Sequence, residues 1–239
     1  MPRVVWSPIF SLLAVLAFVC TISGPASAIP LSYKLKVGST YAYEIIQRSK
    51  SEAAANDFKA SHPMERTSKL EITVLAYRDG VYVLDISSGD RRVRRYLRPN
   101  GAVVAAPGEA GPLFPFFATF AEGDWQTGKP QVITTSFPSG KGSVNARWET
   151  TFSGLDATKK KATIGISGDV ALPADRVISR TLNAKGTMIL NLEMGCPERA
   201  DWTVSYEMNF ANKEIAVIRD LWRVRETRST SCRLTGVKP

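Results

Sequence analysis

Hydrophobic and polar side chains alternate along much of this chain, most clearly between Leu70 and Ile86 (LEITVLAYRDGVYVLDI). Alternation with a period of two places every second side chain on the same face of a β-strand. The pattern is interrupted at Asp79-Gly80, and glycine tolerates the positive φ that a tight hairpin turn demands. The segment therefore predicts a β-hairpin that turns at Asp79-Gly80.

The same combination of short alternating runs and turn residues recurs along the chain. Turns are predicted at Pro99–Gly101, at Ser139–Gly142 and near Asn212–Lys213, each between two β-prone segments. Further strands are predicted over residues 39–48, 162–166, 188–193 and 221–227. Short strands with turn signals about every ten residues indicate an all-β protein, either an antiparallel sandwich or an incomplete β-barrel.

Helical spacing occurs in only two segments, so we expect one or two short helices beside the strands. The first is Glu52–Lys59 (EAAANDFK), which is rich in alanine. The second is Leu113–Glu122, where apolar side chains occupy the i, i+3, i+4 and i+7 positions of a helix face: Leu113, Phe116, Phe117 and Phe120. Nothing indicates a second domain. Residues 29–239 are expected to form a single β-rich domain, with 107–130 as a crossover between two halves of the sheet system.

The N-terminal residues have the order of features that marks a secretory signal peptide. Arg3 supplies a positive charge, an apolar run extends from Ile9 to Ile22, and Ala26-Ser27-Ala28 provides the small residues of a cleavage site. The run is shorter than the ~20 apolar residues that span a bilayer. Residues 1–28 are therefore predicted to be cleaved after Ala28. We expect a secreted or periplasmic protein with no transmembrane span.

Removal of this leader takes Cys20 with it and leaves two cysteines, Cys196 and Cys232. An exported protein meets an oxidising compartment, where two remaining cysteines can satisfy each other. Neither belongs to a CxxC motif. The sequence therefore predicts a Cys196–Cys232 disulfide.

Residue types that perform catalysis or bind metals are scarce. His62 is the single histidine, and its polar surroundings before Pro63 indicate an exposed loop. Catalytic Ser-His or Cys-His pairs need a base held against the nucleophile, and zinc sites need clusters of histidine or cysteine. We therefore assign no catalytic residue, no metal site and no cofactor. A histidine-free hydrolase that uses paired carboxylates is a minor alternative, because the acidic residues are spread almost evenly.

The basic residues are distributed less evenly than the acidic ones. The chain has 31 lysines and arginines against 22 acidic residues, and five of the arginines lie between Arg91 and Arg98. On a strand, Arg92, Arg94 and Arg98 would share one face, which would attract anionic polymers or lipid headgroups. The alternative is a solvated face whose arginine stems cover apolar surface. Export and the lack of a nucleic-acid-binding motif argue against a nucleic-acid partner.

The segment from Gly111 to Trp125 (GPLFPFFATFAEGDW) concentrates aromatic side chains between prolines and admits two interpretations. In the first it is a short helix that closes the end of the hydrophobic core. In the second it is a movable lid over an apolar groove. The expected ligand contacts of that groove are Phe114, Phe116, Phe117, Phe120 and Trp125.

Four stretches follow one another in an order similar to that of uncharacterised secreted bacterial proteins: LKVGSTYAYEI, RDGVYVLDI, LRPNGAVVA and the apolar stretch that ends in EGDW. Those proteins are all-β and of unknown function, so the resemblance implies a fold class and no catalytic residues. The expected architecture is also similar to that of the periplasmic lipoprotein carriers, whose incomplete barrels surround an apolar cavity.

These observations lead to two functional hypotheses. In the first, the chain is an exported, non-enzymatic envelope protein that binds an apolar or amphipathic ligand, such as a lipid, or a partner through the aromatic groove. In the second, it is a structural or interaction protein that docks on anionic envelope polymers or lipids through its arginine-rich face.

Overall fold

The computed structural model describes residues 28–55, 58–104, 117–139, 142–171, 178–210 and 223–239. Within these ranges the chain forms strands and no helix, which confirms the all-β class. The strands are β1 (Ile29–Pro30), β2 (Thr40–Ala55), β3 (Phe58–Arg78), β4 (Val81–Ser88), β5 (Arg91–Leu97), β6 (Asp124–Trp125), β7 (Pro130–Ser139), β8 (Gly142–Leu155), β9 (Lys161–Ala171), β10 (Ile178–Asn191), β11 (Cys196–Phe210) and β12 (Arg223–Lys238).

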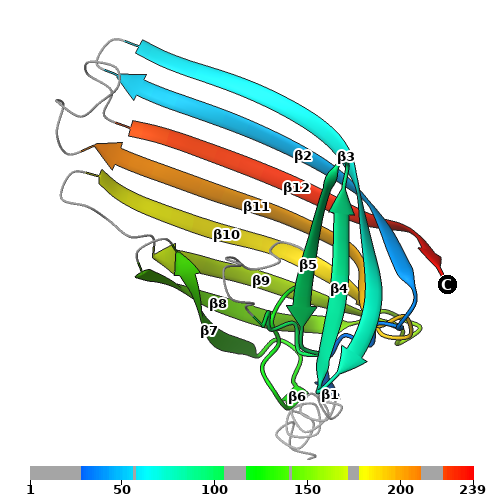
Figure 1. Ribbon diagram of the computed structural model, residues 1–239. Helices are drawn as coiled ribbons and strands as arrows, with labels where there is room; N and C mark the ends of the chain where they lie inside the picture. Colours follow the sequence, from blue (N-terminus) through cyan, green and yellow to red (C-terminus); the bar gives the residue numbers. More distant parts are fainter. Residues whose placement is uncertain (1–27, 56–57, 105–116, 140–141, 172–177, 211–222) are drawn as a thin grey trace, which may run out of the picture.

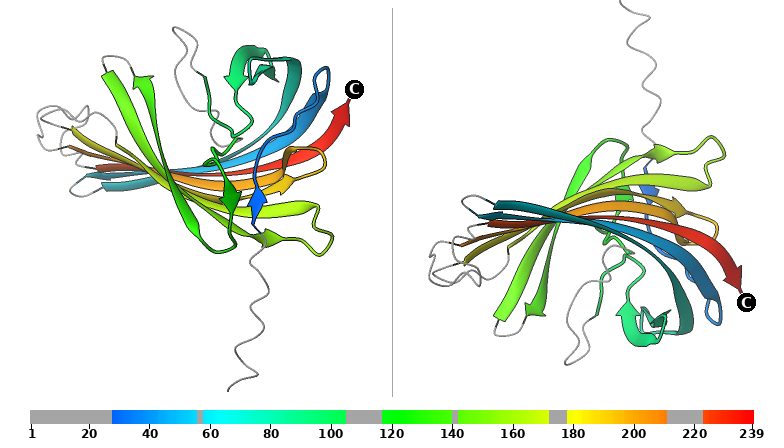
Figure 2. Two further views of the ribbon diagram at one scale, coloured as in Figure 1. Left: turned by 90° about the horizontal axis from the view of Figure 1, so that it is seen from below. Right: turned by 90° about the horizontal axis from the view of Figure 1, so that it is seen from above.

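Ten of these strands form one antiparallel sheet in the order β5-β4-β3-β2-β12-β11-β10-β9-β8-β7 (Figure 1). The remaining two, β1 and β6, pair with each other. The sheet is open, because its edge strands β5 and β7 do not pair. It twists strongly, so that β7 and β8 cross the direction of β2 and β12 (Figure 2). The chain between Leu97 and Pro130 therefore leads from one edge strand to the other.

The β3–β4 hairpin confirms the turn predicted from the alternating pattern. Arg78 pairs with Val81, and the two residues between them have positive φ, 52° at Asp79 and 75° at Gly80. These values are typical of the turn that matches the twist of a hairpin. The turn at Pro99–Gly101 is also confirmed, since the N–H of Arg98 donates to the carbonyl oxygen of Ala102 at 2.8 Å.

The two helices expected from sequence are absent from the described residues. Residues Glu52–Ala55 are part of β2. They pair with β3 without a shift in register, up to the last pair, Ala55 with Phe58. Cross-strand hydrogen bonds thus override the helical propensity of the alanines. Residues 117–121 are irregular rather than helical. The N–H of Phe120 donates to the carbonyl oxygen of Asn100 at 2.7 Å. In a helix this N–H would donate to a carbonyl oxygen of the preceding turn instead. Leu113 and Phe116 lie outside the described residues.

The hydrophobic core covers one face of the sheet, which we call the inner face; the opposite face is the outer face. The inner face is defined by the buried side chains of alternate strand positions, such as Tyr43, Ile72 and Phe152. Two segments outside the large sheet pack across it: Leu31–Leu35 before β2, and Phe117–Trp125 after β5.

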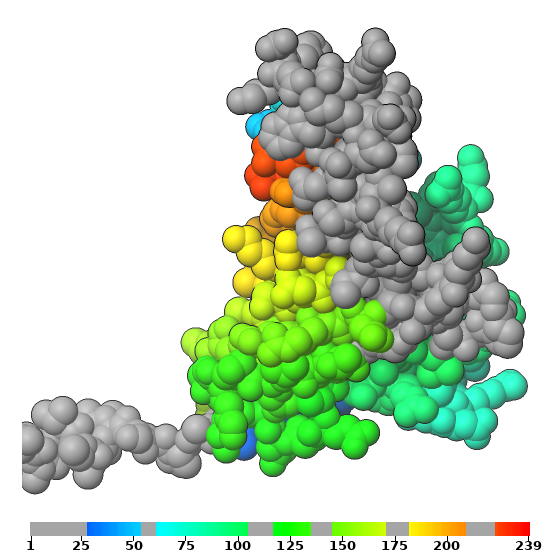
Figure 3. Space-filling view, turned by 90° about the vertical axis from the view of Figure 1, so that its left-hand side faces the viewer, coloured from blue at the N-terminus to red at the C-terminus, as the bar shows by residue number. Residues whose placement is uncertain are grey.

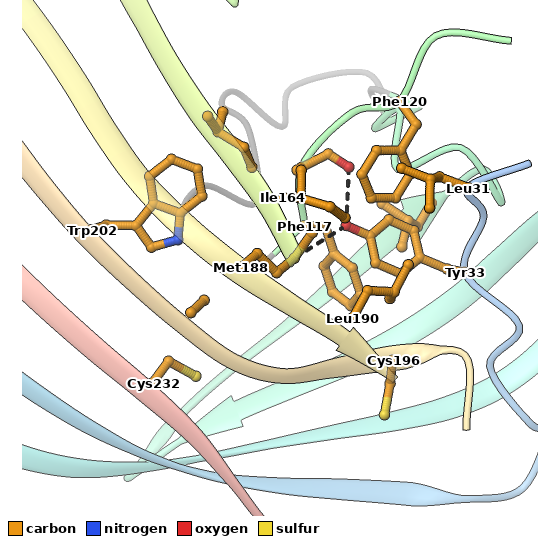
Figure 4. Close-up of a cluster of buried hydrophobic side chains, with 14 of the residues drawn as sticks. Leu31, Tyr33, Phe117, Phe120, Ile164, Met188, Leu190, Cys196, Trp202 and Cys232 are labelled. Carbon is orange, nitrogen blue, oxygen red and sulfur yellow. Dashed lines mark hydrogen bonds between the residues drawn. The ribbon is translucent and has the colours of Figure 1, made fainter. Parts of the chain in front are cut away.

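Tyr33 lies at the centre of this packing (Figure 4). Its ring stacks on Phe120 at 5.1 Å between centroids and meets Phe117 edge to face at 5.0 Å. Its hydroxyl donates to the carbonyl oxygen of Ala118 at 3.0 Å. The N-terminal segment and the crossover are therefore joined by one buried aromatic cluster, in which Trp125 is fully buried.

The predicted leader lies outside the described residues except for Ala28. Its removal remains a prediction. Ile29, the first residue after the predicted cleavage site, pairs with Trp125 in the small sheet.

The predicted Cys196–Cys232 disulfide is wrong, because both cysteines are free and buried. Cys232 lies opposite Ala200, which is four residues away from Cys196 on β11. Four residues of strand span roughly 13 Å at about 3.3 Å per residue. A disulfide requires Cα atoms within about 7 Å. Figure 4 shows the two side chains well apart on neighbouring strands.

Both thiols are expected to be unreactive in the folded protein. Burial raises the pKa of Cys196 from 9.0 to about 11 and that of Cys232 to about 12. The unfolded chain loses these protons near pH 9, whereas the folded chain retains them. The contribution that the two protonated thiols make to the free energy of unfolding is therefore complete below pH 9. It is lost as the pH rises towards 11–12.

Three measurements check the state of the two thiols. At pH 8, iodoacetamide should modify neither thiol until denaturant is added. Dithiothreitol should leave the midpoint of unfolding unchanged. A Cys232→Ala variant is the control for the pH dependence, because its free energy of unfolding should fall less between pH 9 and 11. If dithiothreitol lowered the midpoint of unfolding, the two cysteines would form a disulfide after all.

Candidate functional site

On the inner face the core extends towards the ends of β8–β12 that lie far from β4 and β5, on the left of Figure 1. Figure 3 views the molecule from this end, with β12 (red), β11 (orange) and β10 (yellow) above β7 and β8 (green). The strand register places the inner-face residues of this region in rows that run across the sheet, since residues directly opposite each other share a face.

Three such rows cross β8, β9, β10 and β11 in that order. They consist of Thr150, Ile166, Gly186 and Trp202; of Trp148, Gly168, Ala184 and Val204; and of Ala146, Val170, Leu182 and Tyr206. We call the apolar surface that they form the apolar floor. Trp148 and Trp202 are buried, whereas Leu182, Val204 and Tyr206 are half-buried. Most of the floor therefore belongs to the buried core, and its partly exposed side chains are those of Leu182, Val204 and Tyr206.

The same three rows become polar where they continue across β12, β2 and β3. They add Thr230, Gln47 and Arg66; Arg228, Ser49 and Met64; and Glu226, Ser51 and His62. We call this half of the inner face the polar margin. Arg228 donates to Glu226 at 2.7 Å within it. In each row the main change from apolar to polar falls between β11 and β12; Thr150 on β8 and Met64 on β3 are the exceptions.

Glycines on β9 and β10 allow the two indole rings to lie flat on the sheet. A Cβ atom added to Gly168 would lie 2.6 Å from Cζ3 of Trp148, and one added to Gly186 would lie 2.7 Å from Cε3 of Trp202. These distances are shorter than any real carbon contact, so each ring occupies the space that a side chain would need. The floor is flat because of these two cross-strand pairs.

The structure separates the aromatic residues expected to bind a ligand. Phe117, Phe120 and Trp125 are all buried in the core around Tyr33. Phe114 and Phe116 lie outside the described residues. A ligand-contacting role for these five residues remains a prediction. The apolar floor was not singled out from sequence, although its signal exists in the alternation of RADWTVSYEM, where Trp202, Val204 and Tyr206 fall on one face.

The predicted arginine-rich strand is β5, at one edge of the sheet. Arg92 and Arg94 are exposed, and Arg98 is exposed next to the following turn. Arg92 forms an ion pair with Asp85 at 3.3 Å, and the Asp85 side chain is only 19% exposed. Charged side chains at an edge strand also discourage pairing with other chains. Both the anion-binding and the solvated interpretation are compatible with this position.

Side chains that could hold a metal ion do not gather in one place: no group of three His, Cys, Asp or Glu occurs among the described residues. His62 is exposed as expected, but it belongs to β3 rather than to a loop. The shallow depressions of the outer face are lined by mixed charges, for example Arg147, Asp169 and Lys185 in one of them. Among the described residues there is also no helix of the length and apolarity needed to cross a membrane.

Comparison with known proteins does not identify a family. No family model and no curated protein matches the chain. A crystal structure of an outer membrane channel from Pseudomonas putida F1 aligns with 84% of this chain and 97% of that chain, at 12% identity and a TM-score of 0.23. A similarity at that level carries no inference about fold or function.

Proposed function

We propose that this protein is an exported, non-enzymatic envelope protein that binds an amphipathic molecule along its inner face. The apolar part of the ligand lies on the apolar floor, and its anionic headgroup lies at the polar margin. The observation that supports this proposal is the change of polarity between β11 and β12 in three successive rows. A single molecule with an apolar and a polar end matches that boundary.

The apolar floor supplies the driving force for binding. Leu182, Val204 and Tyr206 retain contact with solvent, which a bound acyl or aromatic group would remove. Burial of each 200 Å² of apolar surface is worth about 5 kcal/mol before the costs of association are subtracted. The indole rings of Trp148 and Trp202 belong to the same floor but are buried, so they add little exposed area of their own.

The polar margin favours an anionic headgroup over a cationic one. Arg228 and Arg66 are exposed on this face. Among the residues that define the polar margin, these two are basic and Glu226 alone is acidic. Arg228 uses one nitrogen in its contact with Glu226, which leaves further N–H donors for a ligand. The formal net charge of the chain, +9, attracts anions in the same sense.

A single substitution on β11 tests the proposal. Val204→Asp places a carboxylate in the middle of the apolar floor, whereas Ser205→Asp places the same group on the outer face one residue away. The probe is a fatty acid brominated near its methyl end, which quenches indole fluorescence on contact. We expect saturable quenching of the natural protein, at least tenfold weaker binding by Val204→Asp, and unchanged binding by Ser205→Asp.

Circular dichroism should show that both variants are folded. Equal binding by the two variants, or no quenching of the natural protein, would refute the proposal. Native mass spectrometry of the protein purified from its host provides a second readout. A co-purified amphipathic molecule should be present on the natural protein and on Ser205→Asp, and absent from Val204→Asp.

A further inference from the structure

The two edges of the large sheet differ in how they are protected from other strands. β5 carries four arginines in seven residues, and part of its outer side is occupied by residues 102–104. β7 has no charged residue in its ten positions, PQVITTSFPS. Within the described part of the chain no segment pairs with its outer side. Val132 on this strand is 51% exposed. Natural edge strands are protected by charge, by proline, by bulges or by a covering segment, and of these, among the described residues, β7 has only the prolines near its two ends.

The β7–β8 hairpin determines which backbone groups of β7 face outward. Ser139 pairs with Gly142 across a two-residue loop, so this pair is hydrogen-bonded and the bonded pairs alternate from there. Odd-numbered residues therefore bond to β8, and even-numbered residues point their N–H and C=O groups to the open edge. Val132, Thr134 and Ser136 supply outward donors, whereas Pro130 and Pro138 have none.

The opposite edge of the sheet confirms this rule. Ser88 pairs with Arg91 across another two-residue loop, which predicts that even-numbered residues of β5 face outward. The carbonyl oxygen of Tyr96 indeed accepts from the N–H of Val104 at 2.9 Å, and the N–H of Arg98 donates outward at 2.8 Å.

We propose that β7 pairs with β7 of a second copy of this chain, antiparallel and two-fold symmetric about Thr134. In this register Thr134 lies opposite its own copy, Val132 lies opposite Ser136, and Pro130 lies opposite Pro138. Every outward donor then meets an outward acceptor, with about six hydrogen bonds in all. The two prolines, which have no donor to offer, fall together at both ends of the ladder.

The symmetry of the proline spacing favours a second copy as the occupant. β7 carries no charged residue, so pairing along it adds no like-charge contact to the general repulsion between two basic chains. A partner strand without the same proline spacing would place a C=O group within the ladder against Pro130 or Pro138, which have no N–H to donate to it. The register also places odd-numbered residues opposite odd-numbered residues. Ile133 pairs with Trp148 and lies on the inner face, so the inner faces of the two copies become continuous.

Charge substitutions at the symmetry point test this pairing. The side chain of Thr134 is exposed and does not contribute to the core. Thr134→Lys places two like charges directly opposite each other, and Thr134→Glu does the same with the opposite sign. We expect the full mature protein to dimerise in sedimentation velocity experiments, each charged variant to raise the dimer dissociation constant at least tenfold, and an equimolar mixture of the two to dimerise again. Thr134→Val should dimerise like the natural protein.

The rescue in the mixture distinguishes direct pairing from damage to the fold. A natural protein that stays monomeric up to about 100 μM, or a Thr134→Lys variant that dimerises like Thr134→Val, would overturn the proposal. Failure of the mixture to dimerise would do the same. The test is independent of ligand binding, because Thr134 lies on the outer face and contributes nothing to the apolar floor.

Discussion

Replacement of Tyr33 by alanine is expected to lower the free energy of unfolding by about 3–5 kcal/mol. The side chain is fully buried and contacts Phe117 and Phe120, so its removal leaves a cavity between the N-terminal segment and the crossover. The surrounding sheet can close only part of that cavity, because these two segments are anchored elsewhere. The N–H of Tyr33 donates to Pro99 at 2.7 Å, and that of Phe120 donates to Asn100.

Tyr33→Phe is the matched control for this substitution. It preserves both ring contacts and removes only the contacts of the hydroxyl, with the carbonyl oxygen of Ala118 and with Sδ of Met188, so it should cost about 1 kcal/mol. The measurement is denaturant unfolding at pH 7, followed by circular dichroism and by indole fluorescence. Equal losses in the two variants would show that the hydroxyl, and not the aromatic packing, joins the two segments.

Substitution of Gly168 by alanine is expected to destabilise the protein by about 2–3 kcal/mol, because a methyl group there overlaps the ring of Trp148. The added Cβ would also lie 2.8 Å from the carbonyl oxygen of Arg147, so a movement of the ring alone cannot relieve the overlap. The near-ultraviolet circular dichroism of Trp148 should also change in this variant, because the ring is displaced. Binding of the brominated fatty acid should weaken, since Trp148 belongs to the apolar floor.

Gly165 on the same strand provides the control. Its nearest neighbour would be the carbonyl oxygen of Thr151 at 3.9 Å from an added Cβ, an ordinary contact. Gly165→Ala should therefore be neutral or stabilising by up to about 1 kcal/mol, through the reduced entropy of the unfolded chain. If the two variants lose equal stability, the loss comes from strand glycines in general and not from the ring of Trp148.

Features encoded within a few residues of one another were predictable from sequence. The turn at Asp79-Gly80 follows from the conformational freedom of glycine between two alternating segments, and the turn at Pro99–Gly101 follows from similar chemistry. The all-β class follows from the repetition of these units. The helical spacing around Phe117 and Phe120 was misleading, because contacts with Tyr33 and Asn100 hold that segment in a non-helical conformation.

The candidate site could not be predicted in the same way. The sequence predicts which side of β11 carries Trp202, Val204 and Tyr206, but it does not reveal that β12, and not another strand, lies beside them. The polarity boundary exists only because that pairing places Arg228 next to Val204. The wrong disulfide has the same origin, since cysteine count indicated a partner while register determined the separation of the two thiols.

By itself, the sequence determined the class of the fold, two of its tight turns and the alternation of faces within each strand, because these depend on backbone preferences and side-chain periodicity over short distances. Tertiary structure alone decided the strand order, the burial of the aromatic crossover, the state of the cysteines and the two-sided character of the inner face. Each of these depends on which distant segments become neighbours, and that choice is made by the packing of the whole sheet.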